Sequence, residues 1–138
     1  MKLGTKPAPA WLEWVYALIL SLFCTHEIDA ATKGEWRMLP GLSLLNDDAG
    51  LFWFVLLHIP LFALIFWLSY HRQTVLRERA RLVACALVII HAVAHFALSG
   101  HALYHFHGPM EALTVYGPAL AGLVYIGVSL RGDGSAQT

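Results

Sequence analysis

Long apolar stretches separated by short polar connections dominate the chain. They lie at about residues 10–30, 51–70, 81–99 and 111–130. A helix needs about 20 mainly apolar residues to cross a membrane. The last three stretches reach that length directly, and the first reaches it if its helix continues through the segment HEIDAA. The pattern predicts an all-α, four-transmembrane-helix bundle, with residues 1–138 forming a single membrane domain.

The connections differ in character. Residues 35–45 are amphipathic, which predicts a short interfacial helix between the first and second membrane helices. Residues 71–81 are short and basic, and residues 99–110 contain neither Lys nor Arg. We expect the tail, residues 131–138, to be disordered.

The Lys and Arg residues predict the orientation. With four spans, one side of the membrane carries Lys2, Lys6, Arg72, Arg77, Arg79, Arg81 and Arg131, and the other carries Lys33 and Arg37. The side richer in Lys and Arg faces the cytoplasm. We therefore expect both termini in the cytoplasm, in an integral protein of the bacterial inner membrane.

Composition agrees with a membrane location. The chain is 58% hydrophobic and only 13% charged, with a formal net charge of zero. Soluble domains carry about 25% charged residues. The lipid bilayer is the expected partner, and nothing in the charge indicates a nucleic acid. The oligomeric state stays open.

Five of the eight histidines lie in HAVAHFALSGHALYHFHG, residues 91–108, among mainly apolar neighbours. A helix rises 1.5 Å per residue, so four histidines of three helices fall at one level, roughly 15–22 Å above the cytoplasmic edge. These four are His26, His58, His91 and His95. His91 and His95 share a helix face because they are four residues apart, and Asp29 follows His26 by three residues.

Ionisable groups inside a membrane are costly and normally have a partner. Imidazoles and carboxylates are good ligands for transition metals, and helical bundles build metal sites from such groups on facing helices. The sequence thus predicts a divalent metal, zinc or iron, in the outer half of the bundle. The expected ligands are His26, Asp29, His58, His91 and His95.

Whether the protein is an enzyme stays open at this point. If it is one, Glu27, Glu35 and Tyr116 are candidate catalytic residues. The substrate would be lipid-like or would arrive from the outer side, and metal-assisted hydrolysis and oxygen chemistry are both candidate reactions.

Other interpretations fit the same residues. The histidines could join the helices by hydrogen bonds alone, bind haem b in an electron-transfer protein, or line a proton or metal-ion pathway. Few polar groups continue toward the cytoplasmic side, which argues against a pathway. Glu35 could lie on the polar face of the interfacial helix, and His101, His105 and His107 could belong to a solvated loop.

The segment HEIDAATKGEW, then His58, then H-A-V-A-H resembles the small multi-pass membrane proteins with an HXXEE-type domain of unknown function. The resemblance covers most of the chain but rests on few residues. It implies that His26 and Asp29 match the histidine and first acid of one motif, and that His91 and His95 match a later pair. Ala30 stands where the second acid belongs, so Glu27 or Glu35 would have to replace it. The resemblance supports a metal-type site without naming a reaction.

Overall fold

The structure is a computed structural model that describes residues 9–134. Its long helices are α1 (Ala10–Lys33), α2 (Asp47–Ser69) and α3 (Thr74–Leu98), followed by a fourth span over Pro109–Arg131. The fourth span combines α4 (Pro109–Glu111), the π-helical turn η3 (Ala112–Tyr116) and α5 (Gly117–Gly134). All four are long and apolar enough to cross a membrane, which confirms the predicted all-α architecture.

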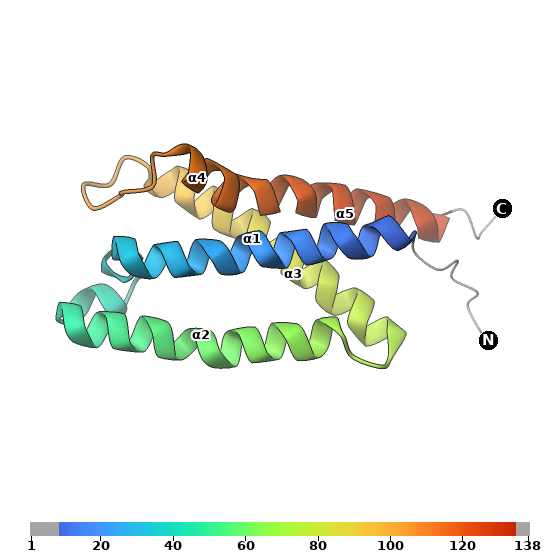
Figure 1. Cartoon of the computed structure of the whole chain (residues 1–138), viewed down its shortest axis with the longest axis horizontal. Coiled ribbons are helices and arrows are strands. Elements are labelled where there is room, and N and C mark those ends of the chain that lie inside the picture. The colour runs from blue at the N-terminus through green and yellow to red at the C-terminus, as the bar shows by residue number, and fades with distance from the viewer. Residues whose placement is uncertain (1–8, 135–138) are drawn as a thin grey trace.

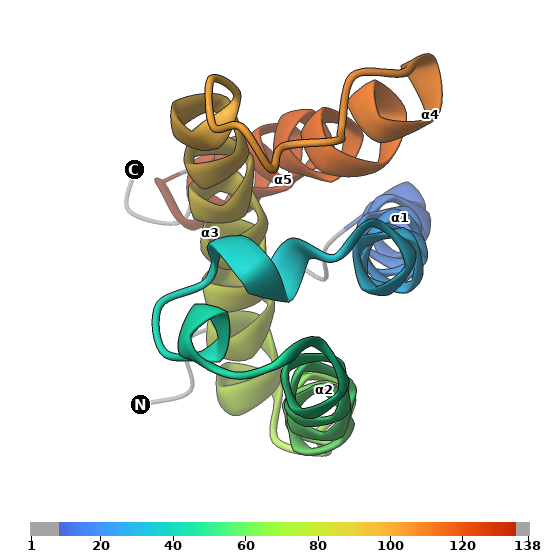
Figure 2. The same cartoon turned by 90° about the vertical axis from the view of Figure 1, so that its left-hand side faces the viewer.

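The helices run up and down, so that the α1–α2 and α3–α4 connections lie at one end and the α2–α3 turn lies at the other (Figure 1). We call these the loop end and the turn end. α5 packs against both α1 and α3, whereas α2 packs mainly against α3. Seen from the loop end, the segment that follows α1 crosses between α1 and α3, and α2 stands to one side (Figure 2). The segment after α1 therefore covers the loop end of the bundle.

Residues 35–45 form two short 3-10 helices instead of the one interfacial helix that we expected. These are η1 (Glu35–Met38) and η2 (Leu42–Leu44). Leu39 is extended, as a residue before a proline tends to be, and Gly41 has a φ of 87°. The sequence Pro40-Gly41 thus interrupts the helix in the middle of the amphipathic pattern.

Two helices also extend beyond the apolar stretches that the sequence shows. α3 begins at Thr74 although its apolar part begins near residue 81, because the basic residues between them are good helix formers. α5 continues to Gly134, so the expected disorder is wrong for residues 131–134. Residues 135–138 of the tail, and Lys2 and Lys6 near the N-terminus, lie outside the described residues.

Buried side chains form separate clusters along the bundle. Toward the turn end, Tyr16 and Ile19 of α1 pack with Cys85 of α3 and Tyr125 of α5. At the loop end, Ala30, Trp36, Phe54, Tyr104 and Phe106 form a second, largely aromatic cluster. Three histidines lie between these two clusters, as described next.

Candidate metal centre

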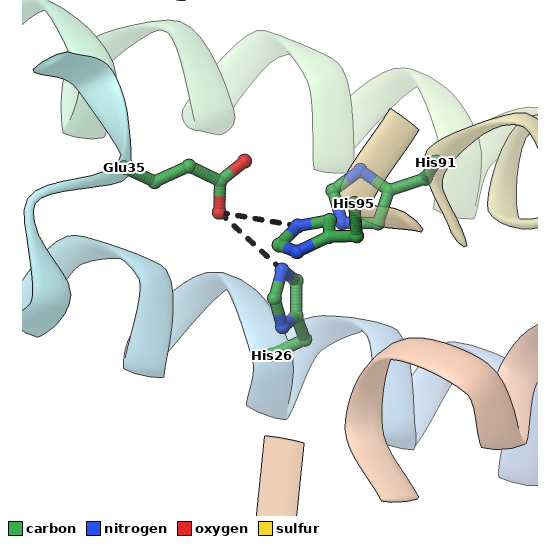
Figure 3. A group of neighbouring side chains, drawn as sticks. All are labelled: His26, Glu35, His91 and His95. Atoms are coloured by element: carbon green, nitrogen blue, oxygen red, sulfur yellow. Dashed lines mark ion pairs between the residues drawn. The ribbon is translucent and has the colours of Figure 1, made fainter. Parts of the chain in front are cut away.

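Three histidines and one glutamate converge between α1, α3 and η1. His26 comes from α1, His91 and His95 from α3, and Glu35 from the start of η1 (Figure 3). One ligand atom from each residue lies within 4.8 Å of the others. His26, Glu35 and His95 are buried and His91 is half-buried. We call these four residues the His3Glu cluster.

A helix end brings Glu35 to the histidines. α1 stops at Gly34, which adopts the left-handed conformation with a φ of 73° and donates its backbone N–H to the carbonyl of Ala30. This is a common way to end a helix, and glycine adopts it without the steric cost of a Cβ atom. The chain then folds back over the bundle, where Trp36 packs against Phe54 and closely approaches Gly50 of α2. Glu35 is thereby held facing inward.

The two distances from Glu35 to the imidazoles are longer than those of good hydrogen bonds. Glu35 Oε2 lies 3.4 Å from His26 Nε2 and 3.6 Å from His95 Nε2. Good N–H···O hydrogen bonds are about 2.7–3.2 Å long. In a tetrahedral zinc site with bonds of about 2.0–2.1 Å, neighbouring ligand atoms are about 3.3 Å apart. The distances of 3.4 and 3.6 Å are close to that value, and all the ligand atoms of the cluster lie within 4.8 Å of one another.

Several atoms of the cluster are buried without a hydrogen-bond partner among residues 9–134. They are His26 Nδ1, His26 Nε2, Glu35 Oε2 and His91 Nε2. Buried polar atoms almost always have a partner, and leaving one without costs about 1–3 kcal/mol. Each of the four cluster residues also has one ligand atom within 4.8 Å of the others, which is an arrangement that a metal ion would satisfy.

Neighbouring aromatic residues hold the imidazoles in place. The three imidazole rings lie 4.6–4.8 Å from one another, centroid to centroid. Tyr104 Oη lies 3.2 Å from Nδ1 of His95, and the ring of Phe106 packs edge-on against the same imidazole. A hydrogen bond at Nδ1 fixes the ring and leaves Nε2 to face the centre of the cluster. His95 therefore has the outer contact that metal-binding histidines commonly have.

The charge state of the cluster follows from Glu35. Burial would raise the pKa of this carboxyl, but the two imidazoles of His26 and His95 that face it outweigh burial and hold its pKa at about 2. Burial, with the nearby Tyr116 hydroxyl, raises the pKa of Tyr104 to about 12. At neutral pH the cluster thus offers one anionic carboxylate, and Tyr104 keeps its proton.

The structure places Asp29 away from the cluster. Its Oδ2 lies 2.9 Å from Nζ of Lys33, one helical turn further along α1. Lys33 also pairs with Glu111 at the start of the fourth span and lies over the ring of Phe106. Asp29 is therefore part of an ion-pair network that joins α1 to α4.

His58 also lies outside the cluster, in a pair with Glu27. His58 Nε2 lies 2.9 Å from Glu27 Oε2, and its Nδ1 lies 2.6 Å from the backbone carbonyl of Phe54. Glu27 is thus buried beside His58 and does not belong to the His3Glu cluster.

The other candidates lie around this centre. Tyr116 is partly exposed at the π-helical turn. His101, His105 and His107 of the α3–α4 loop are exposed and lie outside the cluster.

A pocket of about 260 Å³ borders the cluster between α1, α2 and the η1–η2 segment. Glu35 and His91 line it from the cluster, and Glu27 and His58 line it from the neighbouring pair. The rest of its wall is apolar and consists of Phe23, Leu39, Leu42, Phe54, Leu57 and Leu61. One side of the cluster therefore faces a space that a small molecule can enter.

Comparison with known families adds one finding. A family model matches residues 12–132, a range that contains every residue of the cluster and the pocket. The chain belongs to DUF6713, a family of unknown function. No curated protein and no solved structure matches the chain. That the family is uncharacterised agrees with the resemblance drawn from the sequence, whereas the relation of DUF6713 to HXXEE-type proteins stays a prediction.

In this DUF6713 chain, Glu35 is the cluster residue that the sequence pattern did not select as a ligand. Lys33-Gly34 is a typical signal for the end of a helix, so a reversal before Glu35 was predictable. The direction of the reversed segment depends on the packing of Trp36 on α2, which the local sequence does not specify.

Proposed function

We propose that this protein binds one divalent transition metal ion, zinc or iron, through His26, Glu35, His91 and His95, and that this metal centre is the working part of a membrane enzyme. The observation that carries the proposal is the convergence of four ligand atoms within 4.8 Å, three of them from α1 and α3, which are apolar enough to cross a membrane. Three imidazoles and one carboxylate suit both metals.

The ring spacing favours a single ion over haem b. A haem lies between two axial imidazoles, so its plane would have to separate them. The three imidazoles instead contact one another, with centroids 4.6–4.8 Å apart. A porphyrin would have to push these rings apart, whereas a single ion needs only ligand atoms that already lie within 4.8 Å of one another.

The pocket supports an enzyme over a purely structural metal site. A tetrahedral zinc with four protein ligands is typical of structural sites, whereas catalytic zinc has three protein ligands and an open fourth position, or expands to five ligands. Catalysis at the His3Glu cluster therefore requires one further ligand on the ion, and the pocket is the side from which it would come. Glu35 and His91 both reach the pocket wall, and so does the candidate catalytic residue Glu27. Metal-assisted hydrolysis and oxygen chemistry both remain candidate reactions, and the identity of the metal would decide between them.

We further propose that the protein lies in the bacterial inner membrane with its turn end in the cytoplasm. Arg72, Arg77 and Arg79 all lie at the turn end, as does Arg131. A fluorescent protein fused to the C-terminus should then fluoresce in the cytoplasm, and alkaline phosphatase fused at the same point should be inactive. The reverse pair of results would overturn this orientation.

Metal analysis of purified protein tests the metal centre. We expect about one zinc or iron per chain after purification in detergent, and a loss of that metal in the His91→Ala, His95→Ala double variant. The matched control is His101→Ala, His105→Ala, which removes two exposed histidines with the same spacing and should keep the metal. Absence of stoichiometric metal after loading with either ion, or equal loss in both double variants, would overturn the proposal.

A further inference from the structure

The pocket beside the His3Glu cluster has a polar end and an apolar remainder. Its polar wall carries Glu35 and His91 of the cluster and the neighbouring Glu27–His58 pair. Every other lining residue is a Leu or a Phe. A ligand that matches this wall has one polar end, which faces the cluster, and an apolar body.

The size of the pocket indicates how much of that ligand it holds. Its volume is about 260 Å³. Pockets that enclose most of a drug-sized molecule are about 300–1,000 Å³. The pocket therefore has room for a head group and the first few carbons of a chain, and the rest of a longer chain must lie outside it.

The exposed residues of the pocket wall lie on the apolar surface of α2, so we place its opening there. Among its lining residues, Leu57 and Leu61 are exposed, at 53% and 38%. Leu57 lies ten residues after Asp47, where α2 begins, so it lies roughly 15 Å from the loop end of that helix. If α2 spans the membrane, this opening lies within the hydrocarbon region, and a ligand enters from the bilayer.

The Glu27–His58 pair shapes the polar end. Both ring nitrogens of His58 face oxygen atoms, one from the Phe54 carbonyl and one from Glu27. Both ring nitrogens of His58 thus already have a partner, and Oε2 of Glu27 is the partner of Nε2. Glu27 Oε1 makes no hydrogen bond among the described residues, so it can accept one from a hydroxyl group in the pocket. A head group with two oxygens could place one toward the cluster and donate from the other to Glu27.

We infer that the pocket between α1 and α2 takes the oxygen-bearing head of a single-chain amphiphile, such as a protonated fatty acid or a fatty alcohol derivative, directly from the bilayer. This inference rests on the proposed metal centre, because the cluster supplies one of the two polar contacts. The chain of the ligand then extends from the opening along the apolar surface at Leu57 and Leu61.

Photolabelling in a defined bilayer tests the inference. The probe is a sixteen-carbon fatty acid with a diazirine next to its carboxyl group, added to zinc-loaded protein in phosphatidylcholine nanodiscs. We expect adducts on the pocket residues, mapped by mass spectrometry, and competition by excess palmitic acid. A fatty acid that lies free in the bilayer keeps its carboxyl group, and the diazirine beside it, at the interface. Labelling at the depth of Leu57 therefore requires the head of the probe to lie in the pocket.

The matched variants are Leu57→Trp and Leu64→Trp. Both residues lie on α2 and are exposed to the same degree, 53% and 52%, but only Leu57 lines the pocket. Filling the pocket with tryptophan should reduce labelling there by roughly tenfold or more, whereas Leu64→Trp should leave it unchanged. If Leu57→Trp loses its metal, Leu61→Trp serves in its place.

Metal content measured on the same samples separates the two proposals. Zinc bound without competable labelling of the pocket, or with equal labelling in both tryptophan variants, would overturn this inference alone. Absence of zinc in the wild-type protein would overturn the proposed metal centre. Zinc together with pocket labelling that Leu57→Trp abolishes is the expected result.

Discussion

Glu35 Oε2 lies 3.4 Å from His26 Nε2, although a helix end and a reversal of the chain separate the two residues. The contact joins the segment after α1 to the interior of α1 itself. With His91 and His95 of α3, it assembles a buried set of ligands that no single helix contains. The predictions below follow from this arrangement.

Glu35 should matter to metal binding more than the two candidates outside the cluster. Glu35→Gln removes the anionic ligand, so it should lower zinc affinity by about 100-fold or more, beyond the 10–100-fold typical of outer contacts. Asp29→Asn and His58→Ala should change the affinity little, because Asp29 pairs with Lys33 and His58 pairs with Glu27. Competition titration with a zinc chelator measures all three. A large loss in Asp29→Asn with none in Glu35→Gln would favour the ligand set expected from the sequence.

Tyr104 should act through His95. Tyr104→Phe removes the hydroxyl that lies 3.2 Å from His95 Nδ1 while keeping the aromatic packing. Losing such a contact typically weakens metal binding by about 10–100-fold. Tyr70→Phe, an exposed tyrosine at the turn end, is the matched control and should have no effect. The same chelator titration would contradict this role if the two variants behaved alike.

Gly34 should be required for the position of Glu35. Gly34→Ala introduces a Cβ atom at a φ of 73°, which should destabilise the fold by about 1–2 kcal/mol and also weaken zinc binding. Gly127→Ala is the control, since its Cβ atom would meet open space in α5 and alanine favours a helix. Thermal unfolding and zinc titration together test this prediction. Unchanged zinc affinity in Gly34→Ala would show that the reversal does not position the carboxylate.

Arg81 should stabilise the turn end without affecting the metal. Its side chain is buried, donates to the backbone carbonyl of Ser69 at 3.0 Å and to Glu13 Oε1 at 2.6 Å, and lies over the ring of Tyr16. Arg81→Met leaves these acceptors without their donor, so we expect a loss of about 2–4 kcal/mol in unfolding free energy.

The control for Arg81 is Arg79→Met, which changes an exposed arginine on the same helix. Unfolding by SDS titration in mixed micelles measures the stability of both variants. We expect Arg79→Met to stay within about 0.5 kcal/mol of the wild type. Equal stability of the two variants, or loss of zinc in Arg81→Met, would contradict the separation of the turn end from the metal centre.

The sequence predicted the helices well because length and apolarity determine which segments can cross a membrane. It did less well at helix ends. Hydropathy marks the apolar part of α3, whereas the helix itself begins at Thr74, in a basic segment that also favours helix formation. Short helices do lie between α1 and α2 where the sequence predicted one, but Pro40 and Gly41 divide the segment into η1 and η2.

For the site, depth along the helices indicated four histidines, but His58 pairs with Glu27 outside the cluster, and depth did not indicate the carboxylate. The helical rise places His26, His91 and His95 at similar levels on different helices, and the structure brings these three together. Asp29 was the expected carboxylate because it follows His26 by three residues, yet Lys33 lies one turn further on and pairs with it. Glu35 reaches the histidines through a tertiary contact, the packing of Trp36 on α2, and such contacts do not appear in local spacing.

X-ray absorption at the zinc edge of the zinc-loaded protein is the most direct test of the metal centre. The structure predicts a first shell of three imidazole nitrogens and one carboxylate oxygen at about 2.0–2.1 Å, with the outer scattering typical of imidazole rings. His91→Ala, His95→Ala should lose that signal. A shell with sulfur at about 2.3 Å, or one of oxygen alone without imidazole scattering, would contradict the proposal.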